Sequence, residues 1–160
     1  MADVINVGMA DYKITKSPNN LIIAGLGSCI ALCIYDSYAQ IGGMAHVMLP
    51  AANGNVKGEL KKYADTLIPL KYEDLLKLGV KQSRLIAKIT GGASMFSFTG
   101  TPSILKIGDR NIEAVKKELE NIKVPLKAED VGGTSGRTIS FDTSSGILII
   151  KTINQGEKVI

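Results

Sequence analysis

Hydrophobic positions along this chain fall mainly into short runs that are separated by turn-forming residues. The runs are rich in isoleucine and leucine and are typical of buried β-strands. They cover residues 4–8, 21–36, 41–49, 84–89, 126–131, 138–142 and 147–153, and residues 12–15 are a further candidate piece of strand. Pro50 ends the run 41–49, because proline cannot donate to a β-ladder. The runs 21–36 and 41–49 together predict a β-hairpin.

Two other segments instead repeat their apolar residues at helical spacing. In the first, the repeated positions are Leu60, Ala64, Leu67, Tyr72, Leu75 and Leu76. Because Pro69 lies inside this segment, we expect either a kinked helix or two consecutive helices, closed by Gly79. The second segment has Asp109 as a candidate N-cap. Its apolar stripe consists of Ile112, Val115, Leu119 and Ile122.

These elements, six or seven strands and two helical regions, predict an α+β protein. The expected architecture is a layered α/β sandwich of mixed or antiparallel β-sheets. Polar loops are expected around residues 53–55 and over residues 97–103. The chain has 160 residues and no internal repeat, so a single domain over residues 1–160 is the simplest organisation.

Composition and charge narrow the function classes. The hydrophobic content of 45% and charged content of 21% are ordinary for a globular protein. The net charge of +4 comes mostly from scattered lysines, and the densest basic pairs lie in helical segments that also carry acids. Such pairs favour solvated helix faces over a nucleic-acid surface. The N-terminus lacks a secretory signal, and the longest apolar run is too short to span a bilayer, so we expect a cytoplasmic protein without membrane insertion.

The two cysteines, Cys29 and Cys33, lie four residues apart. On one strand they would face the same side at a separation too large for a disulfide, which fits a reduced compartment. Two cysteines and the single His46 are also too few for a structural zinc site, which requires four ligands. We therefore expect neither a metal nor a cofactor.

Cys29 and His46 are the residues with the clearest chemical potential. A thiol and an imidazole in neighbouring segments are the minimum for cysteine nucleophilic catalysis. If the hairpin turn is centred between Ser37 and Tyr38, residues whose numbers sum to 75 face each other, and 29 and 46 do so. Directly opposed side chains share a face, with Cβ atoms roughly 4.5–5.5 Å apart. A one-residue slip would place them on opposite faces.

If this pair meets, proton transfer is the main benefit of the imidazole. A positioned acid or base is worth roughly 10²–10⁴-fold, more than ionisation of the thiol alone. A leaving group that needs a proton, such as ammonia from an amide, would profit most. The alternative is that both residues belong to the core, because free cysteine is commonly buried and Cys33 has that character.

A glycine-rich stretch, Gly91-Gly92-Ala93-Ser94, follows the strand predicted over residues 84–89. Together with Ser28 it is a candidate for binding an oxyanion or substrate through backbone N–H groups. A simple tight turn explains the same stretch equally well. Two further glycine-rich stretches, at 25–27 and 132–138, lack the complete fingerprints of nucleotide-binding loops.

Seven blocks of the chain resemble CheD, the family of chemoreceptor glutamine deamidases. The blocks are GLGSC (25–29), MAHVMLP (44–50), KYAD (62–65), AKITGGASMF (87–96), IGDRN (107–111), EAVKK (113–117) and AEDVGG (128–133). They occur in the family's order and extend over nearly the whole chain. The resemblance implies an α/β sandwich similar to that of bacterial toxin deamidases.

The resemblance also implies an activity and its residues. CheD proteins hydrolyse selected glutamine side chains, on the cytoplasmic helices of methyl-accepting chemotaxis receptors, to glutamate. Cys29 matches the family nucleophile and His46 its catalytic histidine, while the backbone N–H of Cys29 is a candidate oxyanion donor. The family's third catalytic residue is a threonine at the position of Ile23. The group that orients His46 must therefore be absent, another residue or a backbone carbonyl.

Two other functions are also compatible with the sequence. Family members bind and stimulate CheC, a phosphatase of the chemotaxis response regulator. A chain with weak or no catalysis would then serve as a binding module for receptors and a CheC-type phosphatase. An unrelated amidase that acts on small amides is the third possibility, although no pocket-forming insertion supports it.

Overall fold

The computed structural model describes residues 2–52, 60–94 and 106–160. Within these residues the chain forms two α-helices and ten strands. The strands are β1 (Val4–Asn6), β2 (Asp11–Lys16), β3 (Asn20–Leu26), β4 (Ile30–Asp36), β5 (Ile41–Val47), β6 (Leu85–Gly91), β7 (Leu126–Val131), β8 (Arg137–Asp142), β9 (Leu148–Thr152) and β10 (Gly156–Val159). The helices are α1 (Ala64–Leu76) and α2 (Ile107–Asn121), with short 3₁₀ turns η1 (Leu60–Lys62) and η2 (Gln82–Arg84).

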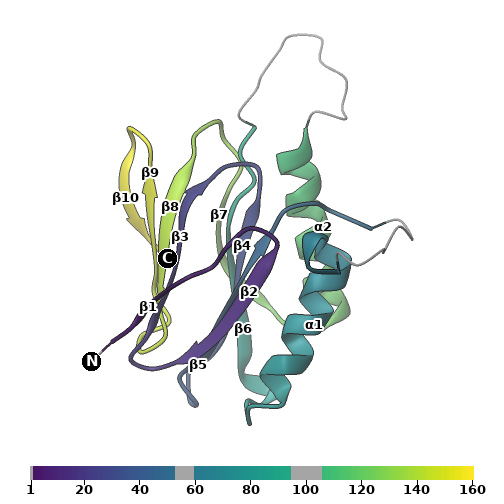
Figure 1. Cartoon of the computed structure of the whole chain (residues 1–160), viewed down its shortest axis with the longest axis vertical. Coiled ribbons are helices and arrows are strands. Elements are labelled where there is room, and N and C mark those ends of the chain that lie inside the picture. Colours follow the sequence, from purple (N-terminus) through teal and green to yellow (C-terminus); the bar gives the residue numbers. More distant parts are fainter. Residues whose placement is uncertain (1, 53–59, 95–105) are drawn as a thin grey trace.

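The strands build two five-stranded sheets that pack face to face. The first sheet has the order β1-β3-β8-β9-β10 and the second has the order β2-β5-β4-β6-β7. Figure 1 shows the second sheet between the first sheet and the two helices, so the molecule has three layers. Each sheet contains one parallel pair among antiparallel ones. The predicted α+β sandwich with two main helical regions is therefore confirmed.

The three layers enclose two hydrophobic cores, and β4 contributes to both. Its side chains alternate, so that Ile30, Leu32 and Ile34 pack in the core beneath the helices. Ala31 and Cys33 pack in the core between the two sheets. All seven residues of β4 are buried, because this central strand is covered on both faces.

The apolar run 21–36 does not form one strand, which corrects the sequence interpretation. It divides into β3 in the first sheet and β4 in the second, so only β4 pairs with β5 as the expected hairpin. A single strand of that length would extend about 50 Å, which is longer than a domain of this size. Gly25, at a φ of +70°, lies where the β3–β8 register shifts, just before the crossing.

The expected number of strands was also too low. The strand β10 was missed because all four of its residues are exposed and show no apolar alternation. The expected loops around residues 53–55 and over 97–103 lie outside the described residues.

The helices differ from the sequence interpretation in their boundaries. The helix α1 continues through Pro69 after the separate turn η1. The helix α2 begins at Ile107, with Lys106 as its N-cap, so the prediction of Asp109 as the cap is wrong. Asp109 lies in the first turn instead, where its negative charge suits the positive end of the helix dipole.

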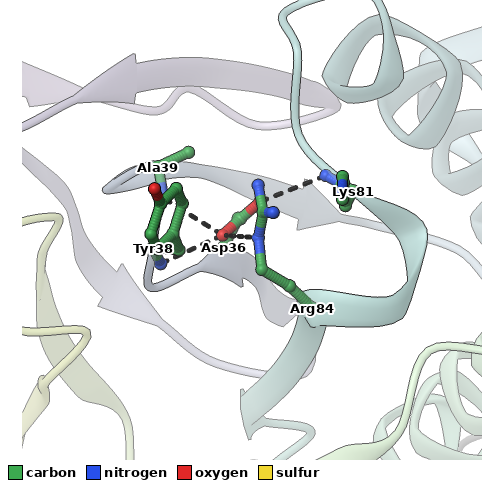
Figure 2. A network of polar contacts seen from close by, with 5 residues as sticks. All are labelled: Asp36, Tyr38, Ala39, Lys81 and Arg84. Carbon is green, nitrogen blue, oxygen red and sulfur yellow. Dashed lines mark hydrogen bonds and ion pairs between the residues drawn. The ribbon is translucent and has the colours of Figure 1, made fainter.

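A buried carboxylate fixes the turn between β4 and β5. Asp36 accepts two hydrogen bonds from Arg84 Nε, at 2.9 and 3.0 Å, and one from its Nη2 at 2.8 Å. The backbone N–H groups of Tyr38, Ala39 and Lys81 also donate to it (Figure 2). Burial alone would raise the pKa of Asp36, but these hydrogen bonds outweigh burial and lower the pKa to about 2.

The Asp36→Asn variant should lose about 1–3 kcal/mol of unfolding free energy at pH 7, because an amide cannot accept from Arg84 as a carboxylate does. The folded carboxylate has the lower pKa, so its contribution is complete above the ordinary value of 3.8 and disappears as the pH falls towards 2. Urea unfolding at pH 7 and pH 2.5 measures this difference. The exposed Asp3→Asn serves as the control, and an equal loss at both pH values would contradict the expectation.

Candidate functional site

The segment Gly27–Cys29 crosses between the sheets and is held by the residues that follow β6. Gly92 N–H donates to the carbonyl of Cys29 at 3.0 Å, and Ala93 N–H donates to the carbonyl of Gly27 at 3.0 Å. Cys29 is free of any disulfide and partly exposed, and it packs at the margin of the core between the sheets. These hydrogen bonds hold the backbone of the segment that carries the thiol.

Gly91 is required for this close packing. A Cβ atom at Gly91 would lie 2.3 Å from the carbonyl oxygen of Cys29, and its φ of +109° is one that other residues rarely adopt. Any side chain here would displace the cysteine segment. The glycine at the end of β6 therefore serves the geometry of Cys29.

The stretch predicted to bind an oxyanion uses its own N–H groups inside the protein. The N–H of Gly92 is bonded to Cys29, and the N–H of Ser94 donates to the carbonyl of Gly133 at 2.9 Å. In this structure Gly91 and Gly92 therefore support the cysteine segment, whereas Ser94 is bonded to the connection between β7 and β8. Ser28 lies within that segment, and its carbonyl is also engaged, by Asn111 Nδ2 at 3.0 Å.

The backbone N–H of Cys29 differs from those of Gly92 and Ser94 in its hydrogen bonding. Within the described parts of the chain it has no hydrogen-bond acceptor, and neither has the N–H of Ser28. Successive free N–H groups form a concavity that suits an anion. The open donors of the site are thus beside the thiol, not in the stretch after β6.

His46 lies in β5 on the face that points to the first sheet, and it is 7% exposed. It faces Ala31 across the β4–β5 ladder, in which paired residue numbers sum to 77. The assumed register of 75, with Cys29 directly opposite His46, is therefore wrong. The turn is centred one residue later than assumed, because the Asp36 carboxylate holds the N–H groups of Tyr38 and Ala39.

The shift of two residues keeps Cys29 and His46 on the same side of the second sheet, since side chains alternate with a period of two. Cys29 precedes β4, two residues before the partner of His46, which makes the two side chains diagonal neighbours. Such neighbours are roughly 7–8 Å apart in a regular ladder. Among the described residues, no hydrogen bond joins them, and a direct contact would require a small movement or a bound substrate.

A backbone carbonyl orients His46. The ring nitrogen Nδ1 lies 3.3 Å from the carbonyl oxygen of Val7, in the connection that leads from β1 to β2. The N–H of Ala10 in the same connection donates to the carbonyl of His46 at 3.1 Å. Ile23, at the position of the family's threonine, is a buried core residue of β3. Because a carbonyl only accepts, Nδ1 carries the proton and the lone pair of the neutral ring lies on Nε2.

Burial shifts both pKa values away from an ion pair. It raises the pKa of the Cys29 thiol above its ordinary value. It also lowers the pKa of His46, although the carbonyls of Val7 and Gly8 act in the opposite direction. At neutral pH the resting pair is therefore a thiol and an uncharged imidazole. Cys33 is fully enclosed, with its pKa raised to about 12 by burial, as expected of a core residue.

Two buried polar residues of the helices were missed from the sequence. Asn111 and Lys71 are both 0% exposed. Each lies where the helical repeat requires a buried position, in α2 beside Val115 and in α1 beside Leu75. A polar residue within an otherwise apolar stripe was the available signal.

Comparison with known proteins identifies the family of this chain. A family model described as "CheD chemotactic sensory transduction" matches residues 48–152, more than half of the chain. The chain belongs to the CheD family. The match begins after His46, so it does not include the two candidate catalytic residues.

Curated CheD relatives match over their full length. A "Probable chemoreceptor glutamine deamidase CheD" of Desulfitobacterium hafniense (strain DSM 10664 / DCB-2) is 56% identical over 160 residues, 100% of both chains. The protein of the same name in Syntrophomonas wolfei is 47% identical over 162 residues, again 100% of both chains. The "Chemoreceptor glutamine deamidase CheD" of Halalkalibacterium halodurans is 46% identical over 162 residues with the same coverage. In the described parts of the CheD chain, no helix has the length and apolarity needed to cross a membrane.

Proposed function

We propose that this CheD protein hydrolyses the carboxamide of selected glutamines on methyl-accepting chemotaxis receptors, with Cys29 as nucleophile and His46 as acid and base. The names of its relatives support the reaction class. The observation that carries the residue roles is the pairing of His46 Nδ1 with the Val7 carbonyl. That contact leaves Nε2 as the basic nitrogen, on the face of the sheet that Cys29 shares.

In the first half of the reaction, Cys29 Sγ attacks the carboxamide carbon as its proton passes to His46 Nε2. The new S–C bond pushes the carbonyl electron pair onto oxygen, where the N–H of Cys29 donates to the developing oxyanion. The C–N bond then breaks, its electron pair stays on nitrogen, and His46 returns the proton. Ammonia leaves, and a thioester of the receptor remains on Cys29.

Water completes the reaction. His46, again neutral, removes a proton from water as its oxygen bonds to the thioester carbon. The C–S bond breaks, the sulfur takes up the proton from His46, and the receptor side chain leaves as glutamate. Each turnover consumes one water and releases one ammonia.

Burial keeps Cys29 and His46 uncharged, so the mechanism must include transfer of the thiol proton to His46. Since thiol and imidazole are both neutral at rest, the attack needs His46 as a base in the same step. A preformed thiolate would gain little, because nucleophilicity falls as the thiol pKa falls. The arrangement therefore suits an amide, whose leaving nitrogen must collect that proton.

A binding module for receptors and a CheC-type phosphatase is the competing function. The isoleucine at position 23 favours it, because the hydroxyl that orients histidine in the family is missing. The Val7 carbonyl supplies that orientation instead, so the loss of threonine does not by itself remove catalysis.

Incubation of the purified protein with cytoplasmic receptor fragments should convert particular glutamines to glutamate, each with a mass increase of about one dalton and one ammonia. The value of kcat/KM should rise with pH to a plateau, because the base must be neutral, and the midpoint should lie below the ordinary histidine value of 6.5. Mass spectrometry over pH 4.5–9 measures both. Failure to convert any glutamine would overturn the proposal, and a rate that climbs continuously through pH 7–8.5 would contradict the neutral pair.

A further inference from the structure

Asn111 lies beneath the site and connects its two halves. Its side-chain nitrogen Nδ2 donates to the carbonyl of Ser28 at 3.0 Å and to the carbonyl of Met48 at 3.1 Å. Ser28 immediately precedes Cys29, and Met48 follows β5, the strand that carries His46. A single buried amide thus holds the backbone on both sides of the candidate catalytic pair.

The bond to Ser28 also sets the direction of a donor. In a trans peptide the C=O and the following N–H point in opposite directions. Because the Ser28 carbonyl is directed at Asn111 on α2, the N–H of Cys29 points away from that helix. The helices cover the opposite face of the second sheet from the one on which His46 lies (Figure 1). The N–H of Cys29, which has no acceptor within the described residues, is therefore directed away from the helix layer, and the face that carries His46 lies opposite that layer.

The first turns of α2 are built to bring this amide into place. A Cβ atom at Gly108 would lie 2.5 Å from the carbonyl oxygen of Gly92 and 2.7 Å from that of Ala93. The helix therefore begins in direct contact with the segment that holds Cys29. This close approach leaves Asn111, one turn later, within reach of the Ser28 carbonyl.

The two ends of the Asn111 amide differ in their hydrogen bonding. Asn111 Oδ1 is buried, and within the described residues it has no hydrogen-bond partner. An unpaired buried oxygen costs folding free energy, while Nδ2 satisfies the carbonyls of Ser28 and Met48, which an apolar residue could not do. Oδ1 therefore costs folding free energy, and the two hydrogen bonds of Nδ2 offset that cost.

We propose that Asn111 is a positioning residue of the deamidation site, which aims the oxyanion-binding N–H of Cys29 and keeps Cys29 and His46 in register. The proposal rests on the proposed function. Asn111 is fully buried and takes no part in substrate binding, so its removal should affect the chemical step and not receptor affinity.

The Asn111→Leu variant should lose about 10²-fold in kcat, because a misplacement of the Cys29 N–H by about 1 Å has roughly that cost, with KM unchanged within threefold. Gln82→Leu is the matched control. Gln82 Nε2 also donates to two backbone carbonyls, those of Ile122 and Lys123, but before the start of β6 and far from Cys29. It should keep kcat within twofold. If Asn111→Leu does not fold, Asn111→Ser, whose hydroxyl retains one donor, should show an intermediate loss.

A spectroscopic measurement keeps this test independent of activity. The chain has only two cysteines, so protein labelled with ¹⁵N-cysteine gives two amide signals, from Cys29 and Cys33. Asn111→Leu should shift the Cys29 signal and leave that of Cys33 in place, and Gln82→Leu should shift neither. If the wild type does not deamidate receptors, only the proposed function fails, and the spectra still decide. An unmoved Cys29 signal, or a kcat for Asn111→Leu within threefold of Gln82→Leu, overturns the proposal.

Discussion

Replacing Cys29 with alanine should reduce receptor deamidation at least about 10³-fold, to the rate seen without protein. The variant retains the fold but has no sulfur to form the thioester, and His46 alone can only assist water. Mass spectrometry of receptor fragments after long incubation measures the remaining conversion. Activity above one tenth of the wild-type rate would show that Cys29 is not the nucleophile.

Cys33→Ala is the matched control for this variant. Cys33 is the other thiol of the chain, 1% exposed in the core between the sheets. Its replacement should cost about 1 kcal/mol of stability through a small cavity and leave kcat nearly unchanged. The comparison separates the loss of a reactive thiol from the loss of a buried sulfur.

The same variant also distinguishes the two candidate functions. Binding of Cys29→Ala to a CheC-type phosphatase, measured by calorimetry, should match any binding of the wild type, since one partly exposed thiol contributes little area. If the wild type binds such a phosphatase but deamidates nothing, the protein functions as a binding module.

Replacing Lys71 with methionine should stabilise the protein at pH 7 by about 3 kcal/mol, equivalent to roughly 6–12 °C in Tm. Lys71 is 0% exposed, and its ammonium donates to the carbonyl of Leu32 at 2.6 Å. Its stem lies against Gly43, where an added Cβ would be 2.9 Å from Lys71 Cε. Methionine has nearly the same length and removes a buried charge.

The effect should depend on pH in a defined direction. Burial lowers the pKa of Lys71 from 10.5 to about 7, and Cys33 acts in the opposite direction. Between pH 7 and 10.5 the unfolded chain holds more protons than the folded one, so wild-type stability gains from each rise in pH. The advantage of Lys71→Met should therefore be largest below pH 7 and shrink as the pH approaches 10.5.

Thermal unfolding at several pH values between 6 and 10 measures this difference. Lys117→Met is the control, since Lys117 is an exposed lysine within α2 and its replacement should change the Tm by little at any pH. A constant difference between Lys71→Met and the wild type across this range, or a destabilised variant, would contradict the expectation.

Local patterns in the sequence were sufficient for the layers of the fold. The alternation of apolar runs and two helical repeats led to an α+β sandwich, because each face that must be buried leaves its own period in the sequence. The same patterns placed Cys29 before a buried strand and His46 within another. Their common side survived an error of two in the register, because side-chain direction repeats every second residue.

Tertiary contacts decided the remaining features. The run 21–36 divides between two sheets because no single strand of that length fits in the domain, and the register follows from Asp36, whose partner Arg84 lies 48 residues away. The partner of His46 is a main-chain oxygen of Val7, and every residue has one, so no residue type could have indicated it.

The support of Cys29 shows most clearly the difference between what the sequence determined and what tertiary contacts decided. The sequence by itself determined that a thiol, an imidazole and several glycines occur in neighbouring segments. Only the tertiary structure showed that Gly91 and Gly92 contact the cysteine backbone from the end of β6 and that Asn111, 83 residues from Ser28, bonds to the Ser28 carbonyl from α2. The reason is physical, since a local pattern records which face of an element is buried but not which distant group meets it there.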